Sequence, residues 1–117
     1  MMNVLAVAAG GALGSVLRFA IQKWLNLSFP FGTLAVNIIG CFFAGWLMAK
    51  AANGLTETRA LFLMTGFCGG FTTFSAFSVE NIQLLLEGRW ALPAFYIAVS
   101  VAGGLLAAYT GYKFFRL

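Results

Sequence analysis

Histidine and aspartate are absent from this 117-residue chain, and the only carboxylates belong to Glu57, Glu80 and Glu87. A histidine-based catalytic triad, a zinc site or a carboxylate dyad therefore cannot be assembled from one chain. A phosphate-binding P-loop is excluded as well, because no lysine follows Gly69 and Gly70. We expect a protein that is not an enzyme and that has no organic cofactor.

Charge is also scarce. Charged residues make up 9% of the chain and hydrophobic residues 62%, whereas a soluble domain is about 25% charged. The seven lysines and arginines are scattered singly, so the net charge of +4 suits helix ends at lipid headgroups better than nucleic acid. Cys41 and Cys68 each lie inside an apolar run, which favours small buried residues over a disulfide. The lipid bilayer is the predicted environment, and the predicted location is the cell inner (plasma) membrane.

Four apolar runs use up the chain, at residues 4–21, 33–49, 60–86 and 91–112. A helix of eighteen residues is ~27 Å long, which is about the thickness of the hydrocarbon layer. The shortest of the runs are close to this length. Short polar connectors separate the runs, and no soluble segment is left over. We predict an all-α membrane protein in which residues 1–117 form a single domain of four transmembrane helices.

The distribution of basic residues hardly specifies an orientation in the membrane. Four spans place both termini at one end of the molecule together with four bases, and three bases lie at the other end, a difference of 4 − 3 = 1. Either other signals set the topology or the chain inserts both ways, which would allow an antiparallel homodimer. The four bases at the end with both termini are Lys50, Arg59, Lys113 and Arg116. The three bases at the other end are Arg18, Lys23 and Arg89.

The third run contains an unusual centre, in which Gly69-Gly70 is followed by Thr72-Thr73. Glycines and β-branched residues weaken a helix, and a helix broken inside the membrane frees backbone groups that protein, water or an ion must satisfy. Channels and transporters place ion sites at such breaks. The alternative is that Gly66-x-x-x-Gly70 only lets two helices pack closely.

Phenylalanines recur through the same region at positions 67, 71, 74 and 77, which forms one stripe on a continuous helix. Such a stripe usually faces lipid or the core. Here threonines and serines are interleaved with it, and the electropositive edge of a phenyl ring can favour a small anion. Glu80 lies on the same side and is either functional or close enough to the interface to be solvated.

The other helices offer fewer polar candidates. Asn37 is the lone amide of the second run, and it serves either helix packing or donation into a pore. Arg18 ends a row of small residues in the first run, as an anion attractor or as a snorkelling residue. Tyr96 and Ser100 share one face of the fourth run and indicate a wetted surface.

Three motif blocks extend over nearly the whole chain: Gly10-Gly11-x-x-Gly14-x-x-x-Arg18, Gly32-Thr33-Leu34-x-x-Asn37 and Gly66-Phe67-Cys68-Gly69-Gly70-Phe71-Thr72-Thr73-Phe74-Ser75-x-Phe77-Ser78-x-Glu80. Together they resemble the Fluc family of small fluoride channels. The resemblance implies a fluoride-selective passive channel that lets cytoplasmic fluoride leave the cell and so lowers its toxicity. It also implies a dual-topology, antiparallel homodimer with two pores.

The same resemblance assigns roles to individual residues. The backbone carbonyls of Gly69 and Thr72 from both subunits would hold a central structural Na⁺. The fluoride path would be lined by two ring edges, an amide donor, two hydroxyl residues next to the rings and a polar track on the fourth helix. Gly104 departs from that track, where a further hydroxyl is common. The two ring edges would be Phe74 and Phe77, and the amide donor would be Asn37. The hydroxyl residues next to the rings would be Thr73 and Ser75, and the polar track would contain Tyr96 and Ser100. Arg18 and Glu80 would be vestibule or supporting residues.

Two other functions are alternatives. A small proton-coupled multidrug exporter would carry a membrane-embedded glutamate in its first helix, but residues 4–17 are uncharged, so Glu80 would have to take that role. A non-transporting membrane assembly protein predicts no ion flux and leaves the Thr/Phe/Ser block unexplained.

Overall fold

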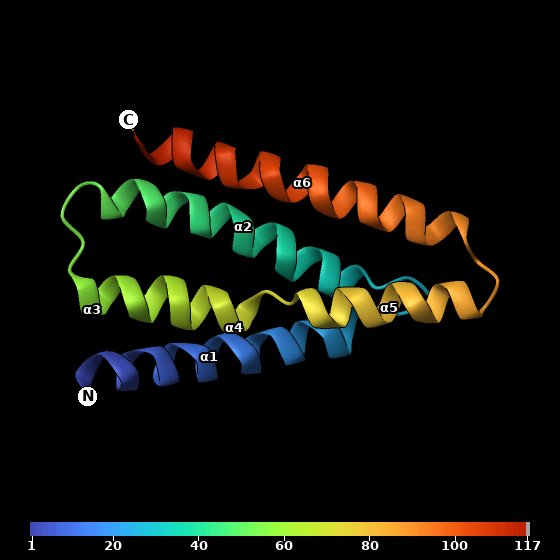
Figure 1. Cartoon of the computed structure of the whole chain (residues 1–117), viewed down its shortest axis with the longest axis horizontal. Helices are drawn as coiled ribbons and strands as arrows, with labels where there is room; N and C mark the ends of the chain where they lie inside the picture. Colours follow the sequence, from blue (N-terminus) through green and yellow to red (C-terminus); the bar gives the residue numbers. More distant parts are fainter. Residues whose placement is uncertain (117) are drawn as a thin grey trace.

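Four long helical crossings make up the molecule (Figure 1). The computed structural model describes residues 1–116, so Leu117 and the side chain of Arg116 lie outside the described residues. The first two crossings are α1 (Met2–Leu25) and α2 (Phe31–Ala51), and the last is α6 (Ala91–Arg116). The third consists of α3 (Glu57–Ala60), the π-helix η1 (Leu61–Cys68), α4 (Gly69–Phe71) and α5 (Phe74–Leu86). All four are long and apolar enough to cross a membrane, which confirms the predicted all-α membrane architecture.

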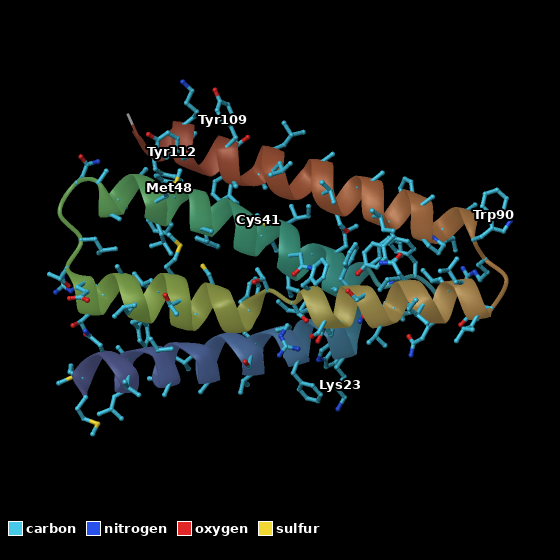
Figure 2. All side chains as sticks on the ribbon, viewed as in Figure 1. Lys23, Cys41, Met48, Trp90, Tyr109 and Tyr112 are labelled. Carbon is cyan, nitrogen blue, oxygen red and sulfur yellow. The ribbon has the colours of Figure 1, made fainter. Side chains whose placement is uncertain are left out.

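The helices extend beyond the apolar runs. Lys23 was expected in the first connector but lies in the last turn of α1, and Lys50 lies in the last turn of α2. Long basic side chains can keep their charge in the headgroup layer while the backbone stays helical, which explains the difference. Aromatic residues lie toward both ends of the molecule: Figure 2 shows Trp90 at one end, and Tyr109 and Tyr112 toward the other. Such belts are typical of the two membrane interfaces.

The third crossing is broken, as predicted, but the break lies one turn beyond the glycines. Gly69 and Gly70 are helical, whereas Thr72 (φ −88°, ψ 157°) and Thr73 (φ −151°, ψ 115°) are extended. β-Branched residues favour extended backbone. Thr73 also caps α5, because its Oγ1 accepts a hydrogen bond from the Ala76 amide at 3.1 Å. Figure 1 shows the break as a thin thread between α4 and α5.

Close helix packing explains the glycines that precede the break. A Cβ on Gly70 would lie 2.6 Å from the carbonyl oxygen of Gly11 on α1. A Cβ on Gly10 or Gly14 would overlap the carbonyl oxygen of Phe62 or Phe67. The same holds between α2 and α6, where Gly45 faces Ala108. The two interpretations of the glycine motif are therefore both correct, since small residues pack α1 against a helix that breaks just afterwards.

The molecule is flat. Its extents are 49 × 31 × 19 Å, and the shortest is less than two helix diameters of about 10–12 Å. Every crossing therefore presents one side to its surroundings, and Figure 1 shows the crossings side by side in this plane. A buried hydrophobic cluster joins Phe29, Leu84 and Tyr96, at the end of the molecule where α1 connects to α2.

Candidate functional site

A groove of about 440 Å³ opens beside the break, between α2, α6 and the third crossing. It brings together many of the residues singled out in the sequence. Tyr96 and Ser75 do not line it, although Ser75 contacts a lining residue, since its hydroxyl lies 3.2 Å from Thr73 Oγ1. The lining residues include Asn37, Gly40, Cys41, Gly69, Thr72, Thr73, Phe74, Phe77 and Ser100.

Asn37 holds the backbone of the break from α2. Its Nδ2 donates to the Thr73 carbonyl at 3.1 Å, and its Oδ1 accepts from the Thr73 amide at 2.8 Å. A lone amide in an apolar span can thus replace both hydrogen bonds that the helix loses at one residue. The expected donation toward an ion stays a prediction, because one amide hydrogen is used for the break and the second is left for the groove.

The clamp by Asn37 frees a carbonyl. In an uninterrupted α-helix the Thr73 amide would donate to Gly69, and the Ala76 amide would donate to Thr72. In the structure these amides donate to Asn37 Oδ1 and to Thr73 Oγ1. The carbonyls of Gly69 and Thr72 have therefore lost their helical donors, and both residues line the groove.

The phenylalanines form two pairs, so the expected single stripe is wrong. Phe67 and Phe71 stack before the break, with centroids 5.7 Å apart and planes at 12°. Phe74 and Phe77 follow it, also 5.7 Å apart but tilted at 41°. Two extended residues between the pairs interrupt the helical repeat that would have aligned them. Phe74 is 79% exposed, which leaves it available to a neighbouring molecule.

Glu80 is the centre of a hydrogen-bond network behind the groove. Its Oε2 accepts from Thr33 Oγ1 at 2.7 Å and from Asn26 Nδ2 at 3.1 Å, and its Oε1 accepts from the Tyr96 hydroxyl at 2.9 Å. Tyr96 is fully buried, and its ring meets Phe77 edge-on at 4.9 Å. The predicted track residue Tyr96 thus supports a groove ring from behind and does not face the groove.

Arg18 lies at the break. Its Nε donates to the Gly70 carbonyl at 2.9 Å, and its guanidinium also donates to Gln22 Oε1 at 3.2 Å. The side chain is half-buried. This position agrees with a supporting role better than with a residue that snorkels toward solvent.

Ser100 and the cysteines complete the groove. Ser100 Oγ is buried and has no hydrogen-bond partner within residues 1–116. Gly104 lies one turn further along α6, where an added Cβ would be 3.4 Å from Cys41 Sγ. The thiol therefore occupies the space next to the position at which the polar track was expected to continue. Cys41 and Cys68 are both free.

Sequence reasoning missed the residues that connect Arg18 to Glu80. Gln22 and Asn26 both donate to Thr33 Oγ1, at 3.0 and 3.2 Å. A signal was present, because Arg18, Gln22 and Asn26 recur every four residues and so share one helix face. Of these connecting residues, only Thr33 belongs to a motif singled out in the sequence, Gly32-Thr33-Leu34-x-x-Asn37.

Comparison with known proteins identifies the family. The family model described as CrcB-like protein, Camphor Resistance (CrcB), matches residues 5–112. The chain belongs to the CrcB family. A protein of Rhizobium etli named "Fluoride-specific ion channel FluC" is 45% identical, with 99% of this chain and 98% of the relative covered. Relatives of the same name from Agrobacterium fabrum and Flavobacterium psychrophilum are 45% and 43% identical, each covering 95% of this chain and 94% of the relative.

The CrcB-family chain is accordingly a multi-pass protein of the inner membrane, with four membrane-spanning helices. The resemblance to fluoride channels noted in the sequence is confirmed by these relatives. The roles assigned to individual groove residues stay predictions.

Proposed function

We propose that this chain is a fluoride-selective, passive ion channel through which cytoplasmic fluoride leaves the cell. The proposal is supported by the names of the relatives and by the groove, which lies beside a helix break within a membrane crossing. The groove offers an amide, hydroxyls and aromatic rings but no cationic side chain. Such a lining can replace the water around a small anion without trapping it.

The channel needs no energy source of its own. A negative interior favours anion exit by ~2.3 kcal/mol per 100 mV. Fluoride re-enters as the neutral weak acid through lipid and dissociates inside. A passive leak that is selective for the anion therefore lowers the internal concentration and the toxicity of fluoride.

We propose further that two copies assemble antiparallel, with one pore on each side. The flat shape, the exposed Phe74 beside the groove and the difference of one basic residue between the two ends support this arrangement. One slab-like chain leaves the groove open on one side, and a second copy would close it. Phe74 and Phe77 would then line the fluoride path, with Asn37, Thr73, Ser75 and Ser100 as polar contributors, and Tyr96 would support Phe77 from behind.

A structural Na⁺ fits the break. The break takes the helical donors away from the carbonyls of Gly69 and Thr72, whereas Arg18 occupies the Gly70 carbonyl. Freed backbone carbonyls at broken membrane helices are typical Na⁺ ligands. When bound, the ion would supply positive charge that favours an anion nearby and would join two subunits.

The test is flux from liposomes that contain the purified protein. We expect release of trapped fluoride, retention of chloride and no need for a proton gradient. Phe74→Ile should slow the release while assembly, followed by size-exclusion chromatography, is unchanged. Phe19→Ile is the matched control, because Phe19 is an exposed ring on α1 away from the groove.

Three outcomes would contradict the proposal. Release of chloride as fast as fluoride would refute selectivity. Proton-dependent transport of organic cations would indicate the exporter, and no flux of any ion would indicate an assembly protein.

A further inference from the structure

A chain of hydrogen bonds connects the two halves of the broken third crossing. It begins at the Gly70 carbonyl in α4, which accepts from Arg18 Nε at 2.9 Å. Arg18 donates to Gln22, Gln22 donates to Thr33 Oγ1 at 3.0 Å, and Thr33 donates to Glu80 in α5 at 2.7 Å. The two ends lie on either side of Thr72 and Thr73, so the chain spans the break through α1 and α2.

Backbone packing places Arg18 at this point. Gly14 lies one turn before it, and an added Cβ there would overlap the Phe67 carbonyl oxygen and lie 2.8 Å from the Phe71 amide. α1 therefore approaches η1 and α4 backbone to backbone. The half-buried guanidinium one turn later can reach only the last carbonyls before the break.

We infer that Arg18 is a positioning residue for the break. Its planar guanidinium binds the Gly70 carbonyl with one donor and the Gln22–Thr33–Glu80 chain with another, and so sets α4 relative to α5. It also occupies the Gly70 carbonyl, whereas the carbonyls of Gly69 and Thr72, two residues that line the groove, have lost their helical donors. The inference rests on the proposed function, since it concerns the carbonyls proposed to hold Na⁺.

The geometry separates this role from that of an anion attractor. An attractor needs only a positive charge, so lysine would replace it. The positioning role needs two donors in a fixed fork, which the compact lysine ammonium on its flexible stem does not provide. Arg18→Lys, which keeps the charge, therefore distinguishes the two roles.

The experiment measures thermal unfolding of the purified protein in detergent while Na⁺ replaces N-methylglucamine at constant ionic strength. The variants are Arg18→Lys and Arg18→Met. The control is Lys23→Met, which removes an exposed positive charge five residues away on the same helix; Figure 2 shows Lys23 pointing away from the other helices.

We expect both Arg18 variants to need about tenfold more Na⁺ for half-maximal stabilisation, which corresponds to about 1.4 kcal/mol of coupling. The Lys23 variant should need the same Na⁺ concentration as the wild type. A general loss of packing would lower the unfolding temperature at every Na⁺ concentration and would not move this midpoint.

Two results would overturn the inference. One is a wild-type midpoint in Arg18→Lys, and the other is a wild-type protein whose stability does not depend on Na⁺. The unfolding readout is independent of fluoride flux. A protein that shows the shift but releases no fluoride would therefore contradict the proposed function and leave the role of Arg18 supported.

Discussion

Replacing Asn37 by alanine tests whether the amide stabilises the break as well as the ion path. Asn37 makes two hydrogen bonds to the backbone of Thr73, since it accepts from the amide and donates to the carbonyl. Alanine removes both bonds and leaves an N–H and a C=O without their partner at membrane depth. We therefore expect Asn37→Ala to lower the free energy of unfolding as well as the fluoride flux.

The magnitude follows from the two backbone groups. A buried polar group that loses its partner costs about 1–3 kcal/mol, so two groups give about 2–6 kcal/mol. Thr73 is only half-buried and lines the groove, where water can replace part of what is lost. We therefore expect a value near the lower end, about 2–3 kcal/mol.

The assay is equilibrium unfolding in mixed micelles, with flux from liposomes measured on the same preparation. Asn37→Asp should be about as destabilised as the alanine variant, because it keeps the acceptor for the Thr73 amide but points an oxygen at the Thr73 carbonyl. Asn53→Ala is the control, since Asn53 lies in the exposed connector and donates one bond to the Ala49 carbonyl of α2, and its loss should change stability by less than about 0.5 kcal/mol. Wild-type stability of Asn37→Ala together with slow flux would refute the reasoning, because the amide would then act on the ion alone.

Two further substitutions probe the surroundings of the break. Gly40→Ala would push a methyl group into Thr72 Cγ2, and overpacking of this kind costs about 1–3 kcal/mol. Thr72→Ser in the same chain should restore stability and flux. If it restores neither, the clash is not the cause of the loss. Tyr96→Phe keeps the ring against Phe77 but removes the bond to Glu80, and it should cost about 1.5–3 kcal/mol in the same unfolding assay. Tyr109→Phe, at an exposed hydroxyl, should cost little, and equal losses in the two tyrosine variants would contradict the importance of the network.

Local properties of the chain were sufficient to predict the crossings and the existence of a break. Long apolar runs need only hydropathy to be recognised, and Thr72-Thr73 after two glycines weakens a helix wherever it occurs. The Gly66-x-x-x-Gly70 spacing likewise indicated close helix packing. These inferences hold because each depends on residues that are neighbours in sequence.

The position of the break and the partners of the polar residues were not predictable in this way. Gly70 is helical where it packs against Gly11 of α1, and Asn37 of α2 binds the backbone of Thr73 in the break. The contacts of Arg18 with Gly70, and of Thr33 with Glu80, join residues 52 and 47 positions apart. Neither the periodicity of residue types along one helix nor a motif within it specifies which side chain of another helix will contact it.

The sequence by itself therefore determined that the protein lies in a lipid bilayer, how many times it crosses the membrane and that most kinds of catalytic site are excluded. These properties follow from which residues are present and how they are grouped along the chain. Only the tertiary structure decided which carbonyls the break leaves free. Asn37 and Arg18 each form hydrogen bonds with backbone groups of the third crossing, so these groups are not left free. Both side chains are far from their partners in sequence, and only helix packing brings them together.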